Sequence, residues 1–242
     1  MSELEENLAR IRARMDAACE RSGRQPDSVR LMAVSKHQPP SRVAEAAAAG
    51  LRLFGENRMQ EAKVKIPQSP GHLEWHFIGH LQSNKARDAV SLFRVVQGVD
   101  SLALAMELHK QAVKQARSLP VLLEVNVAGE SSKFGWNPDR LLAEFLELNA
   151  LSRLEVHGLM TIAPYAVDPE RVRPVFRRLR ELRDRCSDLL GAPLPVLSMG
   201  MSGDLEVAIE EGATLVRVGT ALFGERPRRT DPDAATEATE AG

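Results

Sequence analysis

The fold is decided by a short apolar run that ends in a lysine, residues 30–36, which read RLMAVSK. A run of this length between polar residues is typical of a buried strand. Similar runs recur along the chain, separated by longer segments of helical periodicity, and give eight predicted strands: 30–35, 51–54, 73–78, 94–97, 121–127, 154–159, 195–198 and 214–218. Alternating strands and helices predict right-handed crossovers and a parallel sheet.

A helix is predicted before the first strand. Ser2 and Glu5 form a capping-box pattern, and apolar residues then recur at helical spacing as far as Gly23. Helical periodicity is clearest over 172–189, with Pro169 near the start. Eight strand–helix units after one leading helix fit a closed (β/α)8 barrel of the TIM type better than an open sheet. We predict one domain over 1–225 and a disordered tail over 226–242, which lacks apolar periodicity.

The composition favours a small-molecule partner over nucleic acid or a membrane. Lys plus Arg number 32 and Asp plus Glu 33 in the 242 residues, and the arginines are spread over the predicted helices rather than gathered in one stripe. The N-terminus carries acids where a signal peptide needs bases and then an apolar run, so we expect a cytoplasmic protein. Cys19 and Cys186 lack metal-ligand spacing and are expected to be reduced thiols.

Polar residues gather where the predicted strands end, which is the end of a parallel barrel that carries ligand sites. Lys36 follows the first strand, Asn57 the second and His80 the third. A partly desolvated amine at the barrel mouth, near a cation, is nucleophilic toward an aldehyde and can form a Schiff base. An isolated strand-end lysine, however, more often points into solvent. The neighbouring residues must therefore decide the role of Lys36.

Two later loops suit a phosphate group. Residues 198–204, SMGMSGD, lead directly into a helix, and Gly219-Thr220 repeats this chemistry one strand later. Glycine permits close backbone approach, and phosphate sites after strands seven and eight recur in this type of barrel. The alternative for the first loop is an ordinary turn capped by Ser202 or Asp204.

Arg217 and the histidines complete the candidate groups. Arg217 lies in an apolar strand and needs an acceptor, which is either a carboxylate such as Glu56 or a ring nitrogen of a ligand. His72, His76 and His80 are spaced by four but span a loop and a strand, so no metal site is expected. His80 alone is placed to touch a ligand.

The motifs together resemble the pyridoxal phosphate homeostasis proteins, single-domain relatives of the alanine racemase barrel. The resemblance spans nearly the whole chain and is carried by these segments: AVSK at 33–36, FGENR at 54–58, HFIGHLQSNK at 76–85, EVNV at 124–127, GLM at 158–160, LSMGMS at 197–202 and VRVGT at 216–220.

The resemblance implies a role for each candidate residue. Lys36 carries pyridoxal 5′-phosphate as a Schiff base, Arg217 faces the pyridine nitrogen and Asn57 lines the ring. The phosphate is surrounded by residues of the two loops, Ser198, Gly200, Ser202, Gly219 and Thr220, and the expected cofactor-binding set also includes His80 and Met201.

Two further positions are basic in the family. Many relatives carry a second basic residue two positions after the lysine, where this chain has Gln38, which puts cofactor transfer through that position in doubt. Lys133 matches a basic position of the family, and its role stays open against that of a solvated loop lysine.

The resemblance also bears on whether the protein is an enzyme. A pyridine nitrogen that faces arginine stays unprotonated, so the ring is a weaker electron sink. The racemases add a catalytic tyrosine from a second domain, whereas the only tyrosine here, Tyr165, follows the sixth strand and is expected to pack on the rim. We therefore expect a non-catalytic, monomeric binder that helps supply the cofactor to apo-enzymes.

Two enzymatic readings compete with the binder. The first is a pyridoxal-phosphate racemase, lyase or transaminase. The second is a sugar-phosphate aldolase that uses Lys36 without a cofactor, which lysine and phosphate loops fit equally well; only the family motifs count against it.

Overall fold

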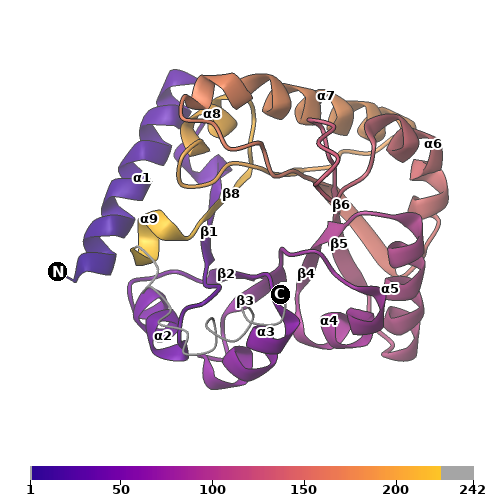
Figure 1. The fold of residues 1–242 in the computed structure, drawn as a ribbon, viewed down its shortest axis with the longest axis horizontal. Helices are drawn as coiled ribbons and strands as arrows, with labels where there is room; N and C mark the ends of the chain where they lie inside the picture. The colour runs from indigo at the N-terminus through magenta and orange to yellow at the C-terminus, as the bar shows by residue number, and fades with distance from the viewer. Residues whose placement is uncertain (1, 225–242) are drawn as a thin grey trace, which may run out of the picture.

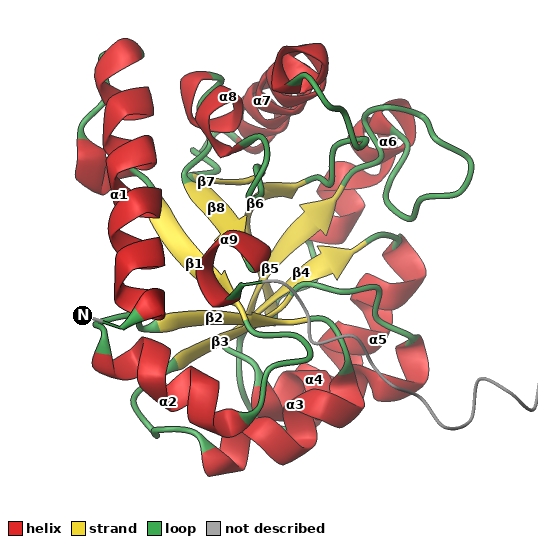
Figure 2. Cartoon of the chain, turned by 60° about the vertical axis from the view of Figure 1, so that its left-hand side comes forward, coloured by secondary structure: helices red, strands yellow, loops and turns green. Residues whose placement is uncertain are grey.

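A computed structural model describes residues 2–224, so the predicted tail over 226–242 lies outside the described residues. Within the described part, eight parallel strands form a closed barrel in sequence order, as predicted (Figures 1 and 2). The strands are β1 (Arg30–Val34), β2 (Leu53–Glu56), β3 (Glu74–Phe77), β4 (Val95–Val99), β5 (Leu119–Glu124), β6 (Leu154–Met160), β7 (Val196–Ser198) and β8 (Leu215–Val218). Pairing of β1 with β8, in which Met32 lies opposite Arg217, closes the barrel.

Helices follow the strands and surround the ring that they form (Figure 1). The α-helices are α1 (Glu3–Arg21), α2 (Pro40–Ala48), α3 (Met59–Lys65), α4 (Ala86–Leu92), α5 (Leu102–Lys114), α6 (Pro138–Asn149), α7 (Arg173–Leu190), α8 (Leu205–Glu210) and α9 (Thr220–Phe223). Short 3-10 helices are η1 (Pro26–Ser28), η2 (Ile66–Gln68), η3 (Ser83–Lys85) and η4 (Pro169–Val172). No helix within residues 2–224 combines the length and apolar character that a bilayer crossing requires.

The leading helix forms as the sequence predicts. The Ser2 side chain accepts from the Glu5 N–H while Glu5 accepts from the Ser2 N–H, which completes the capping box. The buried face of α1 packs against α8 and α9, and Asn7 Nδ2 donates to the Leu222 carbonyl at 3.1 Å. The helix therefore covers the side of the barrel from which the two predicted phosphate loops emerge.

The strands have two unlike faces. Their outward residues, such as Phe54, Phe77 and Val216, join the large apolar layer beneath the helices, which also holds Cys19 and Cys186. The inward residues include a small separate apolar cluster of Met32, Leu53 and Leu215, with Ile78 and Val196 packed on it. Strand residues alternate between the faces, and the inward positions also include polar side chains such as His76, Gln97 and Arg217.

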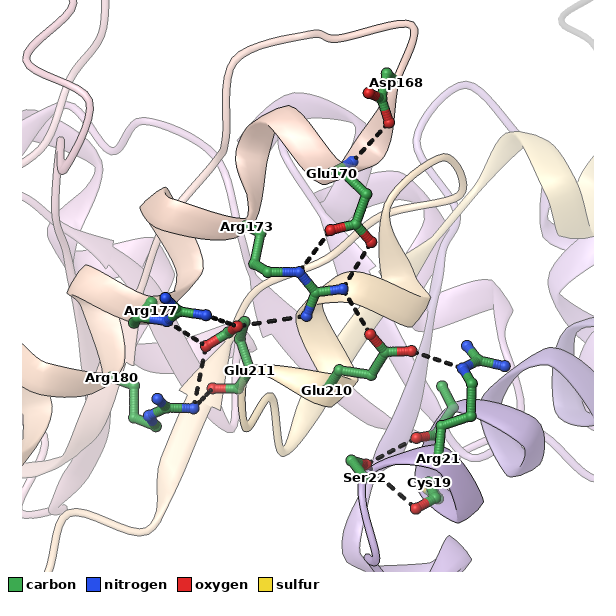
Figure 3. A network of polar contacts seen from close by, with 11 residues as sticks. Cys19, Arg21, Ser22, Asp168, Glu170, Arg173, Arg177, Arg180, Glu210 and Glu211 are labelled. Atoms are coloured by element: carbon green, nitrogen blue, oxygen red, sulfur yellow. Dashed lines mark hydrogen bonds and ion pairs between the residues drawn. The ribbon is translucent and has the colours of Figure 1, made fainter.

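A charged network holds α8 against its neighbours (Figure 3). Arg173 of α7 lies 2.7 Å from Glu210, and Arg177 lies 2.8 Å from Glu211 at the end of α8. Arg21 of α1 lies 2.8 Å from the same Glu210 carboxylate. Because α8 begins directly after loop 198–204, this network fixes the helix that supports the loop.

Candidate functional site

A cavity of about 820 Å³ opens at the carboxyl ends of the strands, where the sequence places the ligand. Most of the predicted cofactor-binding residues line it: Lys36, Asn57, His80, Met201, Ser202, Arg217, Gly219 and Thr220. Ser198 and Gly200 do not line the cavity. They are buried beside it, and their contact with a phosphate stays a prediction. The complete lining comes from seven of the eight strand ends, all except β4, as expected of this fold.

The Lys36 backbone sits in a turn that other residues hold in place. His37, the next residue, has a φ of 64°, in the left-handed region that non-glycine residues rarely occupy. The Glu61 carboxylate of α3 accepts from the His37 N–H at 2.9 Å, and the Gln38 N–H donates to the Ser35 carbonyl at 2.9 Å. These two bonds fix the direction in which the chain leaves β1, and with it the origin of the lysine side chain.

Arg217 is the buried cation of the cavity. Its NH1 donates to Ser198 Oγ at 2.7 Å and its NH2 donates to the Thr161 carbonyl at 2.8 Å. Burial lowers the pKa of Arg217 to about 10, which leaves the side chain charged at neutral pH. Two of the five guanidinium N–H donors are thereby held, and the residue still lines the cavity.

Glu56 does not pair with Arg217, although the sequence left that pairing open. The Glu56 carboxylate instead lies 2.5 Å from Lys65 Nζ and accepts from the Ser35 hydroxyl at 2.6 Å. Both partners lie on the outer side of the strands, below α3, so Glu56 does not take part in the cavity.

Glu124 is a cavity residue to which the sequence analysis gave no role. Burial first, and the charge of Asp100 second, raise the pKa of Glu124 to about 7, whereas Arg217 lowers it. Glu124 is the last residue of β5, so the strand-end rule that found Lys36 could also have found it.

Two buried acceptors of the cavity lack a partner. Within residues 2–224, neither Asn57 Oδ1 nor Glu124 Oε2 receives a hydrogen bond. Buried acceptors are rarely left unpaired, so the cavity suits a ligand that brings polar hydrogen to this wall or retains ordered water there.

The loop 198–204 has the properties of an anion-binding loop. Gly200 has a φ of 93°, and a Cβ there would lie 2.5 Å from the Ala208 Cβ, so glycine is required. Within residues 2–224, the backbone N–H groups of Ser202 and Gly203 find no acceptor, although both residues line the cavity. The Asp204 carboxylate accepts from the Met201 N–H at 2.6 Å, which gives the loop the capped turn that the sequence offered as an alternative. The capped turn and the open donors coexist.

The second loop is joined to the first. The Ala221 N–H donates to Ser202 Oγ at 3.3 Å, and Arg14 of α1 donates to the Ser202 carbonyl at 2.9 Å. The two loops and the leading helix therefore form one connected wall beside Gly219 and Thr220.

Aromatic and basic residues form the rim of the cavity. His80 stacks on Phe134 with ring centroids 3.6 Å apart, and its Nδ1 lies 3.0 Å from Asp100. Lys133 lines the cavity with its amine 2.6 Å from Glu130, and its role stays open. Tyr165 also lies on the rim but is 93% exposed, so the expectation that it packs there is wrong.

Comparisons with known proteins agree with this geometry. The alanine racemase N-terminal domain family matches residues 6–227. A pyridoxal phosphate homeostasis protein of Aquifex aeolicus is 47% identical over 222 residues, which cover 91% of this chain and 97% of the relative. A protein of the same name from Pseudomonas aeruginosa is 47% identical over 230 residues, 93% of this chain and 97% of the relative.

Solved structures show the same fold. PipY of Synechococcus elongatus, solved with PLP bound, has a TM-score of 0.81 and 40% identity, and the match covers 92% of this chain and all of PipY. An alanine racemase of Clostridium difficile has a TM-score of 0.75 at 16% identity, covering 95% of this chain and 58% of the racemase, which supports the fold alone. The chain belongs to the pyridoxal phosphate homeostasis proteins, a family built on the alanine racemase N-terminal domain.

Proposed function

We propose that this protein binds pyridoxal 5′-phosphate in the cavity at the barrel mouth, as a Schiff base on Lys36, and takes part in cytoplasmic supply of the cofactor. The proposal rests on one cavity that brings together the Lys36 amine, the buried Arg217 cation and a loop with unpaired N–H donors. An aldehyde, a ring nitrogen and a phosphate are the three groups that such a cavity can hold at once.

Different residues bind different groups of the ligand. The Lys36 amine adds to the aldehyde carbon, a C=N bond replaces the C=O bond, and one water leaves. Arg217, held by Ser198 and Thr161, offers its remaining N–H donors to the ring nitrogen, which stays unprotonated. The N–H groups of Ser202 and Gly203 would bind the phosphate, together with the hydroxyls of Ser202 and Thr220.

The test uses the two lysines that line the cavity, Lys36 and Lys133. Protein reconstituted with pyridoxal 5′-phosphate should show the visible absorption band of an imine, and borohydride reduction should leave the added mass on the peptide that contains Lys36. Lys36→Ala should abolish both signals, whereas Lys133→Ala should keep them. A colourless wild-type protein, or an adduct that moves to Lys133, would contradict the proposal.

We further infer that the cofactor is held for transfer to apo-enzymes, such that the protein has no steady catalytic turnover and acts as a monomer. An arginine opposite the ring nitrogen gives little assistance to carbanion formation. The relatives are named for homeostasis of the cofactor, which supports supply rather than turnover. Transfer is measured by mixing the loaded protein with an apo-enzyme and following the recovery of that enzyme's activity against free cofactor at equal concentration.

One observation favours the second candidate, a pyridoxal-phosphate racemase or lyase. Glu124, with a pKa of about 7, lines the cavity and could accept or donate a proton at neutral pH. The loaded protein is incubated with each amino acid in D2O, and chirality, deuterium incorporation and keto-acid formation are followed. Turnover at ordinary enzymatic rates that Glu124→Gln abolishes would support the enzyme and contradict the carrier.

A further inference from the structure

An unbroken series of hydrogen bonds crosses the interior of the barrel from Arg217 on β8 to Glu74 on β3. Arg217 NH1 lies 2.7 Å from Ser198 Oγ, and Ser198 Oγ lies 2.7 Å from Gln97 Oε1. Gln97 Nε2 lies 2.8 Å from His76 Nδ1, and His76 Nε2 lies 2.8 Å from Glu74 Oε1. We refer to these five residues as the interior chain.

The interior chain joins two cavities. Arg217 lines the cofactor cavity at the carboxyl ends of the strands. Glu74 and His76 line a second cavity, of about 810 Å³, to which Arg30 and residues at the amino ends of other strands contribute. Arg30 NH2 closes the chain at that end with a contact of 2.8 Å to the second Glu74 oxygen. The middle of the chain is shielded from solvent, because Ser198 and Gln97 are both 0% exposed.

The two ends, together with a neutral His76 ring, give every bond a direction. A guanidinium can only donate, so Ser198 Oγ accepts from Arg217 and its own hydrogen goes to Gln97 Oε1. The Gln97 amide therefore points its Nε2 toward His76, whose Nδ1 must accept. His76 then carries its hydrogen on Nε2 and donates it to Glu74, a carboxylate that only accepts.

If Gln97 were turned around, Ser198 Oγ would accept from both Arg217 and Gln97, its hydrogen would lose the Gln97 acceptor, and Gln97 Oε1 would face the His76 Nδ1 acceptor. If His76 carried a proton on Nδ1, that proton would face the Gln97 donors. Unpaired buried donors are costly, and burial also lowers the pKa of His76, which keeps the ring neutral.

We propose that Gln97 and His76, anchored by Glu74, are positioning residues that orient the Arg217 guanidinium toward the cofactor. The Ser198 hydroxyl can rotate and could otherwise donate in several directions. The residues from Glu74 to Gln97 hold its hydrogen toward Gln97, which leaves a lone pair of Ser198 Oγ to accept from Arg217. The inference rests on the proposed function for its ligand, but the orientation of Arg217 and the state of His76 belong to the protein alone.

The test compares two substitutions of the same histidine. His76→Gln can still accept from Gln97 and donate to Glu74, so it can keep the direction of the chain, whereas His76→Phe fills the space and breaks it. We expect His76→Phe to weaken binding of pyridoxal 5′-phosphate about three- to tenfold and to alter the pH dependence of the visible band, and His76→Gln to restore both toward wild type. Met32→Leu, a volume-conserving change in the apolar cluster of the same interior, is the control that should leave them unchanged.

A second measurement needs no cofactor. Nitrogen-15 NMR of the ligand-free wild type should show His76 as a neutral ring with hydrogen on Nε2, and the Arg217 guanidinium as a slowly rotating group. Gln97→Glu removes the donor that faces His76, so the ring should gain a proton on Nδ1 and become positively charged. These signals would remain interpretable if either His76 variant failed to fold.

The outcomes separate the two proposals. A wild type that binds no pyridoxal 5′-phosphate would contradict the proposed function. The NMR measurement would still test the hydrogen bonds of the interior chain. Hydrogen on Nδ1 of His76 in the wild type, or a His76 ring that stays neutral in Gln97→Glu, would overturn the positioning role. Equal cofactor affinity in His76→Phe and His76→Gln would overturn it as well.

Discussion

The outer and inner faces of the barrel strands are equally buried but are built from different chemistry. Outward side chains such as Phe54 and Phe77 pack beneath the helices in one apolar layer. Inward side chains include His76, Gln97 and Arg217, which are at most 4% exposed and are joined by directed hydrogen bonds. The outer layer therefore stabilises the fold through buried apolar area, which has no preferred direction. The hydrogen-bonded interior instead orients the side chains that face one cavity.

The largest expected effect comes from opening the outer layer. Phe176 of α7 is 0% exposed within it, and Phe176→Ala should lower the free energy of unfolding by about 3–5 kcal/mol, through lost apolar burial and a cavity. Urea unfolding followed by circular dichroism measures the change. Leu189→Ala, on the same helix but 47% exposed, is the control. Similar losses of unfolding free energy in both variants would contradict the role of the buried outer layer in stability.

The outer layer also explains why the sequence could predict the fold. Outward strand residues are apolar, so all eight strands appear as apolar runs, and each is confirmed within a few residues. β2 is displaced from the predicted 51–54 to Leu53–Glu56, because Lys65 neutralises Glu56 and lets the strand continue into a charged residue. β5 begins earlier than predicted, at Leu119, because proline is rare within strands and Pro120 is therefore left out of the predicted strand. Such errors come from contacts that periodicity does not encode.

The candidate site was predictable to a different extent. The strand-end rule and the family motifs located eight residues that line the cavity, since parallel strands bring their ends together. The interior chain could not be predicted, because Gln97 and His76 lie within apolar runs, and Gln97 meets His76 across two neighbouring strands and Ser198 across the barrel. Their pairing depends on barrel closure and on register, which a single sequence does not give.

A smaller effect is expected where a charged pair interrupts the apolar outer layer. Lys65 is 4% exposed and lies 2.5 Å from Glu56, so Lys65→Met leaves a buried carboxylate without its cation. We expect a loss of about 3 kcal/mol, and recovery of most of it in the double variant Glu56→Leu/Lys65→Met. Lys63→Met, which removes a half-exposed ion pair with Asp88 on the same helix, should cost less than about 1 kcal/mol. A single Lys65→Met variant as stable as wild type would contradict the requirement for the pair.

The next prediction concerns the cavity end of the barrel interior. The pKa of Glu124 is raised to about 7 in the folded protein from an ordinary value of 4.5, so folding favours its protonated form. This contribution to stability is present below pH 4.5 and is lost as the pH rises through 7. Glu124→Gln should not show this loss and should be more stable than wild type above pH 7, on the order of 2 kcal/mol after allowance for its unpaired amide. Urea midpoints measured at a series of pH values test this, and a variant that is less stable at alkaline pH would contradict it.

The smallest effect, with the opposite sign, is expected at the other end of the interior. Hydrogen bonds from His76 and Arg30 lower the pKa of Glu74 to about 2 from 4.5, and burial opposes the shift. Its contribution to stability is therefore present above pH 4.5 and is lost as the pH falls toward 2.

Glu74→Gln should be less stable than wild type at neutral pH, and the difference should shrink on acidification. The same urea series measures this. Glu124→Gln then serves as the matched comparison, because its difference from wild type should have the opposite sign and should develop over a higher pH range, between 4.5 and 7. Differences of the same sign in the two variants would contradict the opposite shifts of the two pKa values.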